Sequence, residues 1–334
     1  MTLDRSRRLS VAPMMDWTDR HCRVFHRQFS RHALLYTEMI TASGLVLGGA
    51  DWLLDHAAEE HPLALQLGGS DPDMLSRAVQ MALPFGFEEI NLNIGCPSDR
   101  VQSGRFGACL MREPALVARC CAAMISAAEG RADITVKCRI GVDEQDPESA
   151  LPALIDSCAA VGVRVFIVHA RKAWLDGLSP KDNRSIPPLD YDLVRRVRAS
   201  RPGLWISLNG GIRTAAEAVD HLADFDGVMI GRAAYHDPAE ILGNADAIIL
   251  RVPMARTYPA DAVRAMLPYI QAEVARGTKL HQITRHMLGG FAGRPGARRW
   301  RRILSEGAAR PGAGAELVLE ALSAVEPARA AAAE

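Results

Sequence analysis

The chain alternates between short apolar runs and segments of helical spacing up to about Asn244. Eight near-continuous apolar runs predict buried strands: Leu9–Met15, Ala33–Ile40, Leu63–Gly69, Phe87–Cys96, Ile134–Ile140, Arg164–Ala170, Leu204–Gly210 and Gly227–Gly231. Between most of them the spacing predicts helices, at Asp71–Leu83, Pro114–Ala128, Glu148–Val161, Tyr191–Ser200 and Thr214–Leu222. Strands buried on both faces and separated by helices are typical of parallel sheets. Eight of them predict an α/β fold, a (β/α)8 TIM barrel.

A doubly wound open sheet is the alternative arrangement for such an alternation. That fold usually has fewer strands and carries a G-x-G-x-x-G turn after the first one. Here the first strand ends in Ala12-Pro-Met-Met15, which contains no glycine. The sequence therefore favours the closed barrel.

Beyond Asn244 the pattern becomes entirely helical. Three helices are predicted there, at Asp261–Arg276, Lys279–Leu288 and Ala297–Ser305. We therefore expect a barrel domain over residues 1–245, a small all-helical C-terminal domain over residues 246–325 and a disordered tail over residues 326–334. The N-terminus is expected to lead directly into the first strand.

Charge sets part of the helical region apart. The formal net charge is zero, and 49% hydrophobic with 23% charged residues is ordinary for a soluble globular protein. Between residues 276 and 302, however, eight basic residues occur without one acidic residue: Arg276, Lys279, Arg285, Arg294, Arg298, Arg299, Arg301 and Arg302. A merely solvated helix surface usually mixes both signs. The segment predicts a cationic face for an anionic partner.

The cysteines and the apolar content bear on the compartment. The chain has seven cysteines, an odd number, with no C-x-x-C pair. We therefore predict no disulfide framework and no metal site, and we place the protein in the reducing cytoplasm. Neither a signal-peptide core nor an apolar run of membrane length is evident.

Polar residues gather where the proposed strands end. They are Gln66, Asn93, Cys96, Lys137, Arg139, His169, Arg171, Asn209, Gly210, Gly211, Gly231 and Arg232. One histidine alone is more often a satisfied core residue, but burying so many polar groups without a ligand is costly. Since active sites of barrels lie at the C-terminal ends of the strands, these residues predict one.

The ends of the last two strands resemble a phosphate site. Glycines there let backbone N–H groups approach an anion, and Thr214 can begin a helix whose positive end faces it. Arg232 adds a cation. A phosphorylated cofactor is the natural occupant at this position of a barrel. Lys137 and Gln66 would then face the electron-rich edge of a flavin ring.

Two segments have both a structural and a functional interpretation. Pro97 lacks a donor and restricts Cys96 to an extended conformation, so this thiol cannot lie inside a regular helix or sheet. It is either a structural cysteine closing a strand or a catalytic thiol. Pro13-Met-Met15 is either an apolar bed for a cofactor ring or plain core filling.

Six motifs resemble those of the flavin-dependent tRNA-dihydrouridine synthases. They are Ala12-Pro-Met-Met-Asp-Trp-Thr-Asp19, Asn93-Ile-Gly-Cys-Pro97, Lys137-Cys-Arg-Ile-Gly141, His169-Ala-Arg171, Asn209-Gly-Gly211 and Gly231-Arg232. Two more stretches, Asp182-Asn-Arg-Ser-Ile-Pro-Pro-Leu189 and His281-Gln-Ile-Thr-Arg-His-Met-Leu-Gly289, are similar to the A-type bacterial branch, which acts on uridines 20 and 20a of the D-loop. The resemblance covers roughly residues 9 to 325.

The resemblance implies roles for individual residues. FMN would be bound by Pro13, Met14, Met15, Gln66, Lys137 and His169, and its phosphate by Asn209, Gly210, Gly211, Gly231 and Arg232. NADPH, with NADH as the alternative, would reduce the flavin, which would pass hydride from N5 to C6 of uracil. Cys96 would give the proton to C5, and Asn93 would bind the uracil edge. The glycine-rich loop Ser98–Ala108 is expected to move before the thiol is in reach.

The implied partner is tRNA, contacted through its D-loop by a monomer. Lys181, Arg184, Arg298 and Arg301 are the implied contacts, and they would offset the cost of turning the base out of the tRNA fold. A flavin barrel acting on a free pyrimidine, like dihydroorotate dehydrogenase, is one alternative, although it has no use for the cationic segment. A non-catalytic tRNA-binding chaperone is another, and it predicts a colourless protein.

Overall fold

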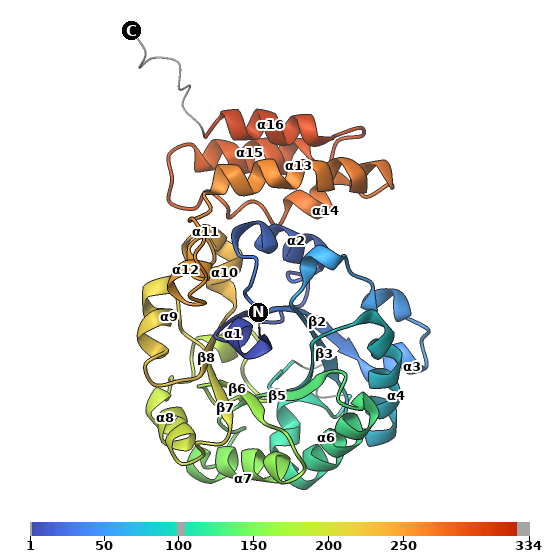
Figure 1. The fold of residues 1–334 in the computed structure, drawn as a ribbon, viewed down its shortest axis with the longest axis vertical. Helices are drawn as coiled ribbons and strands as arrows, with labels where there is room; N and C mark the ends of the chain where they lie inside the picture. The colour runs from blue at the N-terminus through green and yellow to red at the C-terminus, as the bar shows by residue number, and fades with distance from the viewer. Residues whose placement is uncertain (1, 99–103, 326–334) are drawn as a thin grey trace.

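The computed structural model describes residues 2–98 and 104–325, and its centre is a barrel of eight parallel strands (Figure 1). The strands are β1 (Leu9–Val11), β2 (Leu35–Thr41), β3 (Leu63–Gly68), β4 (Glu89–Ile94), β5 (Asp133–Arg139), β6 (Val165–His169), β7 (Trp205–Asn209) and β8 (Gly227–Ile230). Their order is β1-β8-β7-β6-β5-β4-β3-β2. A parallel bridge between Ser10 and Leu34 closes the circle. The predicted α/β barrel is confirmed.

Helices surround the strands, as the spacing predicts. They are α2 (Arg20–Phe29), α3 (Ala42–Val46), α4 (Pro72–Ala82), α6 (Pro114–Ala128), α7 (Pro147–Ala160), α8 (Tyr191–Ala199), α9 (Ala215–His221) and α10 (Arg232–His236), with 3-10 turns η1 (Asp51–Leu54), η2 (Ala58–Glu60), η3 (Leu83–Phe85), η4 (Gly107–Arg112) and η5 (Asp182–Arg184). Side chains of Asp19, Asp71, Asp146, Asp190 and Thr214 cap five of the helices by accepting from backbone N–H groups.

The N-terminus does not lead directly into a strand. A short helix, α1 (Leu3–Arg7), precedes β1 and lies across the N-terminal end of the barrel. Arg7 donates from Nε to Glu89 Oε2 at 2.8 Å and from Nη2 to Asp133 Oδ2 at 2.6 Å. One helical turn is too short for a periodic pattern, so ion pairs with distant residues decide its position.

The barrel interior contains both apolar and polar side chains. Its apolar residues form a small cluster: Ala12, Leu34, Tyr36, Ala64, Val165, Ile167 and Met229. The larger hydrophobic core lies between the strands and the surrounding helices and continues into the C-terminal helices. Buried polar side chains also occur on β3, β4 and β5, at Gln66, Glu89, Asn91, Asn93 and Thr135, and the candidate site extends from them.

The C-terminal helices stand above the barrel in Figure 1. After the connecting helices α11 (Pro238–Ile241) and α12 (Ala245–Ile248) come α13 (Pro259–Ala275), α14 (Leu280–Thr284), α15 (Ala297–Gly307) and α16 (Ala315–Ser323). The predicted second helix is too long, because α14 ends at Thr284 and turns follow it to the glycine pair at 289 and 290. The sequence prediction missed α16.

The two parts meet at α2, which packs against α13 and α14. Asp19 caps α2 through Oδ1, while its Oδ2 accepts from Arg285 Nη2 at 2.6 Å and lies 3.0 Å from His286 Nε2. Burial alone would raise the pKa of Asp19, but its bonds with His286 and Arg285 hold that pKa well below its usual range. A charged carboxylate therefore links the barrel to the helical region.

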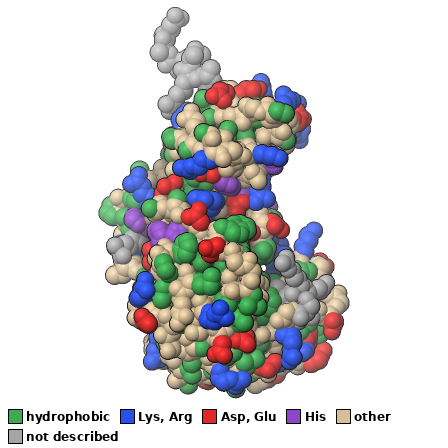
Figure 2. Space-filling model, turned by 90° about the vertical axis from the view of Figure 1, so that its right-hand side faces the viewer, with side chains coloured by type: hydrophobic (Ala, Val, Ile, Leu, Met, Phe, Trp, Pro, Cys, Tyr) green, Lys and Arg blue, Asp and Glu red, His purple; other side chains and the backbone are tan. Residues whose placement is uncertain are grey.

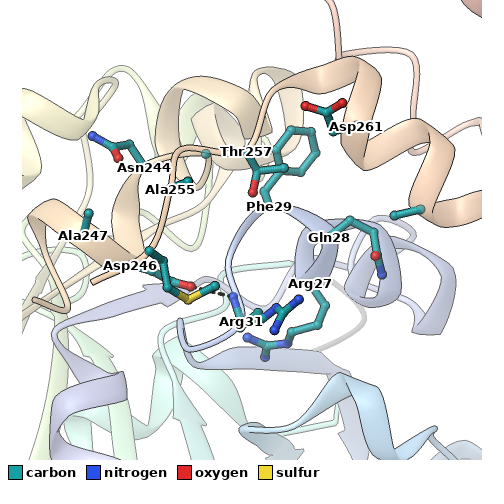
Figure 3. A pocket seen from close by; sticks show the side chains of 13 residues that line it. Arg27, Gln28, Phe29, Arg31, Asn244, Asp246, Ala247, Ala255, Thr257 and Asp261 are labelled. Carbon is teal, nitrogen blue, oxygen red and sulfur yellow. Dashed lines mark hydrogen bonds between the residues drawn. The ribbon is translucent and has the colours of Figure 1, made fainter. Parts of the chain in front are cut away.

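A cavity of about 220 Å³ also lies at this junction (Figure 3). Asp246, beside it, accepts from Ser30 Oγ at 2.5 Å and from Arg31 N at 2.9 Å. Residues just after the proposed boundary at 245 therefore still contact the barrel, and that boundary stays a prediction. The predicted disordered tail, residues 326–334, lies outside the described residues. Within residues 2–98 and 104–325, no helix is long and apolar enough to cross a membrane.

Candidate active site

A cavity of about 770 Å³ opens at the C-terminal ends of the strands. It brings together most of the predicted site residues: Pro13, Met14, Met15, Gln66, Asn93, Cys96, Lys137, His169, Arg184, Asn209, Gly210, Gly211, Gly231 and Arg232. Lys181, Arg298 and Arg301 do not line it. Residues from all eight strands or their following loops line this cavity, as the barrel geometry requires.

The turn that carries Cys96 is built by its neighbours. Strand β4 ends at Ile94, and Asn93 Oδ1 accepts from the backbone N–H groups of Gly95 and Cys96, each at 3.0 Å. From the other side, Arg139 Nε donates to Gly95 O at 3.0 Å. The half-buried Cys96 Sγ lies 3.4 Å from Ser98 Oγ and lines the cavity. The turn therefore holds the thiol at the strand end.

The loop Ser98–Ala108, predicted to move, is only partly described. Residues 99–103 lie outside the described part of the chain. Beyond them, Ala108 N donates to Cys96 O at 2.9 Å, and η4 begins at Gly107. The far end of the loop therefore also supports the turn.

Lys137 and His169 line the cavity, and burial together with neighbouring cations lowers the pKa of both side chains. Burial and the neighbouring Arg139 lower the pKa of Lys137 to about 8. Burial, with Arg139 and Lys137 close by, lowers the pKa of His169 well below its usual value, so its imidazole is neutral at pH 7. Lys137 Nζ donates to Asn209 Oδ1 at 3.2 Å, and Asn209 Nδ2 donates to Met229 O at 2.8 Å.

The glycines after β7 occupy a conformation that favours glycine. Gly210 has φ 105° and Gly211 φ 82°. A Cβ on Gly210 would lie 2.5 Å from the ring of His169, and one on Gly211 would lie 2.4 Å from Tyr191 Oη. Tyr191 Oη donates to Gly210 O at 2.6 Å. Both backbone conformation and side-chain crowding therefore require glycine here.

Three arginines border this turn without a counter-charge. Arg171, Arg213 and Arg232 line the cavity, and within the described chain none of the three forms an ion pair with a carboxylate. Arg171 Nε is buried and has no hydrogen-bond partner among the described residues. Burial, with Arg232 and Arg213 nearby, lowers the pKa of Arg171. The donor set suits a phosphate group, since guanidinium groups bind phosphate oxygens in pairs.

Met14 and Met15, predicted to be either an apolar bed for a cofactor ring or core filling, differ in burial. Met14 packs against the hydrophobic core, and its N–H donates to Thr18 Oγ1 at 2.9 Å. Met15, by contrast, is 52% exposed and borders the cavity. Met14 therefore packs against the core and lines the cavity at once, and both methionines can contact a ligand there.

The predicted tRNA contacts lie in two regions. Arg184 reaches the cavity and donates from Nε to Pro180 O at 2.8 Å, while Lys181 is exposed just before η5. Arg298 and Arg301 are exposed on α15, and neither forms an ion pair within the described chain. Figure 2 shows basic side chains on the helical region and at the narrow waist where it meets the barrel.

Two of the eight predicted cations are neutralised. Arg276 Nη1 lies 2.6 Å from Glu273 Oε1, and Arg285 pairs with Asp19. Both carboxylates lie outside the acid-free segment, so a count within that segment could not find them. The cationic face is therefore narrower than the sequence suggests.

Sequence reasoning missed several residues that support the site. Arg139 was noted at a strand end, but its anchoring of Gly95 O was not, and neither was the contact of Tyr191 with the glycine turn. Glu89, with 0% exposure, is an acidic residue inside an apolar strand. That anomaly in Phe87-Glu-Glu-Ile90 was the available signal, because a buried carboxylate requires partners.

Polar groups at the strand ends of a closed parallel barrel define an enzyme of the (β/α)8 class. Residues 10–326 match the family model described as dihydrouridine synthase. The chain belongs to the dihydrouridine synthase family, whose members are flavin-dependent oxidoreductases.

Several relatives carry the name tRNA-dihydrouridine(20/20a) synthase. The protein from Xanthomonas axonopodis pv. citri (strain 306) is 55% identical over 318 residues, which cover 95% of this chain and 93% of that protein. The protein from Yersinia pestis is 51% identical over 321 residues, 96% and 92% of the two chains. The one from Shewanella oneidensis (strain MR-1) is 52% identical over 324 residues, 97% and 95%.

Proposed function

We propose that this enzyme uses FMN and NADPH to reduce the C5–C6 double bond of D-loop uridine, at positions 20 and 20a of tRNA, to 5,6-dihydrouridine. One observation carries the proposal: the Cys96 thiol lines the same cavity as a candidate phosphate site, which consists of Arg171, Arg213 and Arg232 with the turn at Gly210 and Gly211. The names of relatives that align over nearly the whole chain support the choice of tRNA and of the positions.

The cavity residues fit the proposed cofactor. Gly210 and Gly211, with Arg232 beside them, would hold the phosphate, and the unpartnered Arg171 Nε is a further donor there. Lys137, whose pKa is lowered by burial and Arg139, gains a counter-charge when an electron-rich ring edge lies beside it. Pro13 and Met15 provide the apolar surface. NADH remains the alternative reductant.

When bound and reduced, FMN supplies the hydride that reaches C6 of the uracil. The chain itself has to supply the proton for C5. Cys96 suits that role, because a thiol can act as a general acid and this one lines the cavity. The neutral His169 does not compete as a proton donor, since its imidazolium form is disfavoured by burial and by the surrounding cations. Asn93, which shapes the Cys96 turn, also borders the uracil position.

The substrate must be turned out of the tRNA fold to reach this cavity. Unstacking a base costs a few kcal/mol, and backbone contacts have to offset it. Lys181 and Arg184 beside the cavity, with Arg298 and Arg301 on α15, would make these contacts. An enzyme for a free pyrimidine has no need of such a distant cationic helix. Cytoplasmic location and a monomeric state stay predictions.

Replacing the thiol tests the proposal. We expect Cys96→Ala to bind FMN and tRNA and to oxidise NADPH, but to form dihydrouridine at least about a hundredfold more slowly, the lower end of a general-acid contribution. The measurement is mass-spectrometric mapping of dihydrouridine in unmodified tRNA. Cys109→Ala is the matched control, because Cys109 is also half-buried but its Sγ donates to Phe106 O and does not line the cavity.

Three results would each overturn a part of the proposal. Normal turnover of Cys96→Ala would remove the thiol as the proton donor. Activity of the unaltered protein on free uridine or orotate, with none on tRNA, would replace the substrate class. A purified protein without a flavin spectrum would exclude the cofactor.

A further inference from the structure

A column of buried hydrogen bonds runs through the barrel interior from α1 to the turn of Cys96. Its side chains, from the N-terminal end upward, are Arg7, Glu89, Thr135, Asn91, Gln66 and Asn93. Thr135 Oγ1 donates to Glu89 Oε1 at 2.7 Å, and Asn91 Nδ2 donates to Thr135 Oγ1 at 2.8 Å. Gln66 Nε2 donates to Asn91 Oδ1 at 2.8 Å, and Asn93 Nδ2 donates to Gln66 Oε1 at 2.8 Å.

The column has a direction, and Glu89 sets it. A carboxylate only accepts hydrogen bonds, so the single hydroxyl hydrogen of Thr135 must be donated to Glu89. The Thr135 oxygen is then left to accept from the amide nitrogen of Asn91. That choice turns the Asn91 oxygen toward the nitrogen of Gln66, and the Gln66 oxygen toward Asn93. The Asn93 oxygen remains for the N–H groups of Gly95 and Cys96.

The lower end of the column is an ion pair between Arg7 and Glu89. Burial alone would lower the pKa of Arg7, but the carboxylates of Glu89 and Asp133 raise it above its ordinary value. Tyr36 also donates to Glu89, and burial together with that carboxylate raises the pKa of Tyr36 far above its usual range. Glu89 therefore pairs with the Arg7 guanidinium and accepts hydrogen bonds from the hydroxyl groups of Tyr36 and Thr135.

The upper end of the column faces the cavity. Gln66 and Asn93 each donate one amide hydrogen within the column, and no group among the described residues accepts the second one. The direction set by Glu89 thus makes both amides hydrogen-bond donors toward the cavity. Donors suit a ring that carries carbonyl oxygens, whereas reversed amides would present oxygens and repel it.

We propose that Glu89 is a positioning residue that acts through Thr135 and Asn91. It orients the amides of Gln66 and Asn93 as donors and, through Asn93, holds the Gly95–Cys96 turn. The orientation of the turn stands on geometry alone, whereas the benefit to catalysis rests on the proposed function.

The first experiment uses the protein without flavin, so that activity plays no part. Thr135→Val keeps the shape of the side chain but removes the hydroxyl that links Glu89 to Asn91. We expect the backbone amides of Gly95 and Cys96 to exchange hydrogen for deuterium about tenfold faster, as expected for the loss of one hydrogen bond. Thr135→Ser should restore the native rate.

The matched control is Ser207→Ala. Ser207 is a buried hydroxyl on β7 whose Oγ accepts from Trp205 Nε1 at 2.9 Å, outside the column. A general loosening of the barrel would speed exchange at Gly95 and Cys96 in both variants and would overturn the proposal. Unchanged exchange in Thr135→Val would overturn it as well.

The second experiment follows the flavin-loaded protein in a single turnover with tRNA. We expect dihydrouridine formation to fall about tenfold in Thr135→Val, while reduction of the flavin by NADPH stays within about twofold of the unaltered protein. Glu89→Gln, which can donate as well as accept, should show the same split if Thr135→Val does not fold. An equal fall of both rates would contradict positioning. Absence of dihydrouridine in the unaltered protein would instead refute the proposed function and leave the exchange result standing.

Discussion

Two arginine-rich helices, α8 and α15, have similar sequence patterns and opposite electrostatic surroundings. Helix α8 reads Tyr-Asp-Leu-Val-Arg-Arg-Val-Arg-Ala, and α15 reads Ala-Arg-Arg-Trp-Arg-Arg-Ile-Leu-Ser-Glu-Gly. Each buries an apolar stripe and leaves its arginines at the outer side. On sequence alone either helix could be an anion-binding face.

The arginines of α8 are all paired with acids from neighbouring elements. Arg195 Nε lies 2.7 Å from Asp224 Oδ2, Arg198 Nη2 lies 2.8 Å from Asp226 Oδ1, and Arg196 pairs with Glu148. On α15 the corresponding positions form no ion pair within the described residues. A similar pattern of arginines thus forms ion pairs on α8 and leaves unpaired cations on the described part of α15.

Removing the anchor of α15 has the largest expected effect. Trp300 has 0% exposure, packs 4.9 Å from the ring of Phe291 and donates from Nε1 to Met287 O at 3.1 Å. Trp300→Ala should lower the free energy of unfolding by about 3–5 kcal/mol. It should also abolish tRNA binding, because α15 loses the buried side chain that packs it against its neighbours. Thermal melts and binding titrations measure both effects. Trp300→Phe is the control, and full tRNA affinity in Trp300→Ala would contradict the assignment of the face.

Removing charge from α15 should weaken tRNA binding without a loss of stability. We expect the double variant Arg298→Ala/Arg301→Ala to bind tRNA about tenfold more weakly and with a shallower salt dependence, since fewer counterions are released. Flavin reduction should be unchanged. Titrations at several salt concentrations measure the slope. An unchanged slope would show that these two arginines do not touch the tRNA.

A change of pH separates the buried cation of the cavity from the exposed ones. Lys137, with a pKa of about 8, carries its proton below that pH and loses it above, whereas guanidinium groups in general keep their charge over this range. FMN affinity of the flavin-free protein should fall about tenfold from pH 7 to 9, as expected when binding requires one proton. Lys137→Arg should remove this dependence. A flat profile in the unaltered protein would mean that FMN does not need the cation.

The paired arginines of α8 should give the smallest effect. Arg195→Ala/Arg198→Ala removes two charges with the same spacing as the α15 double variant. We expect unchanged tRNA affinity and salt slope and a fall of a few degrees in the melting temperature, because exposed ion pairs contribute little to stability. The same titrations and melts apply. A loss of tRNA affinity equal to that of the α15 variant would erase the contrast between the two helices.

Much of the barrel could be predicted because its signals are local. All eight strands occur where apolar runs predict them, although β1 ends at Val11 and not at Met15, since Pro13 has no N–H to continue the ladder. The site residues also followed from position, because the end of every parallel strand lies at the same edge. Helix α16 was missed because its apolar residues pack against α13 and α15 and need no strong pattern of their own.

The sequence by itself determined which residues are buried in strands and which polar groups stand at their ends, because both depend on neighbours along the chain. Only the tertiary structure decided which charges have partners. Asp224 and Asp226 reach α8 from other elements, Asp19 neutralises Arg285, and Glu89 directs a column that ends at Cys96. Electrostatic and hydrogen-bond partners are chosen in space over a few ångströms, so residues far apart in the chain meet in ways that spacing does not reveal.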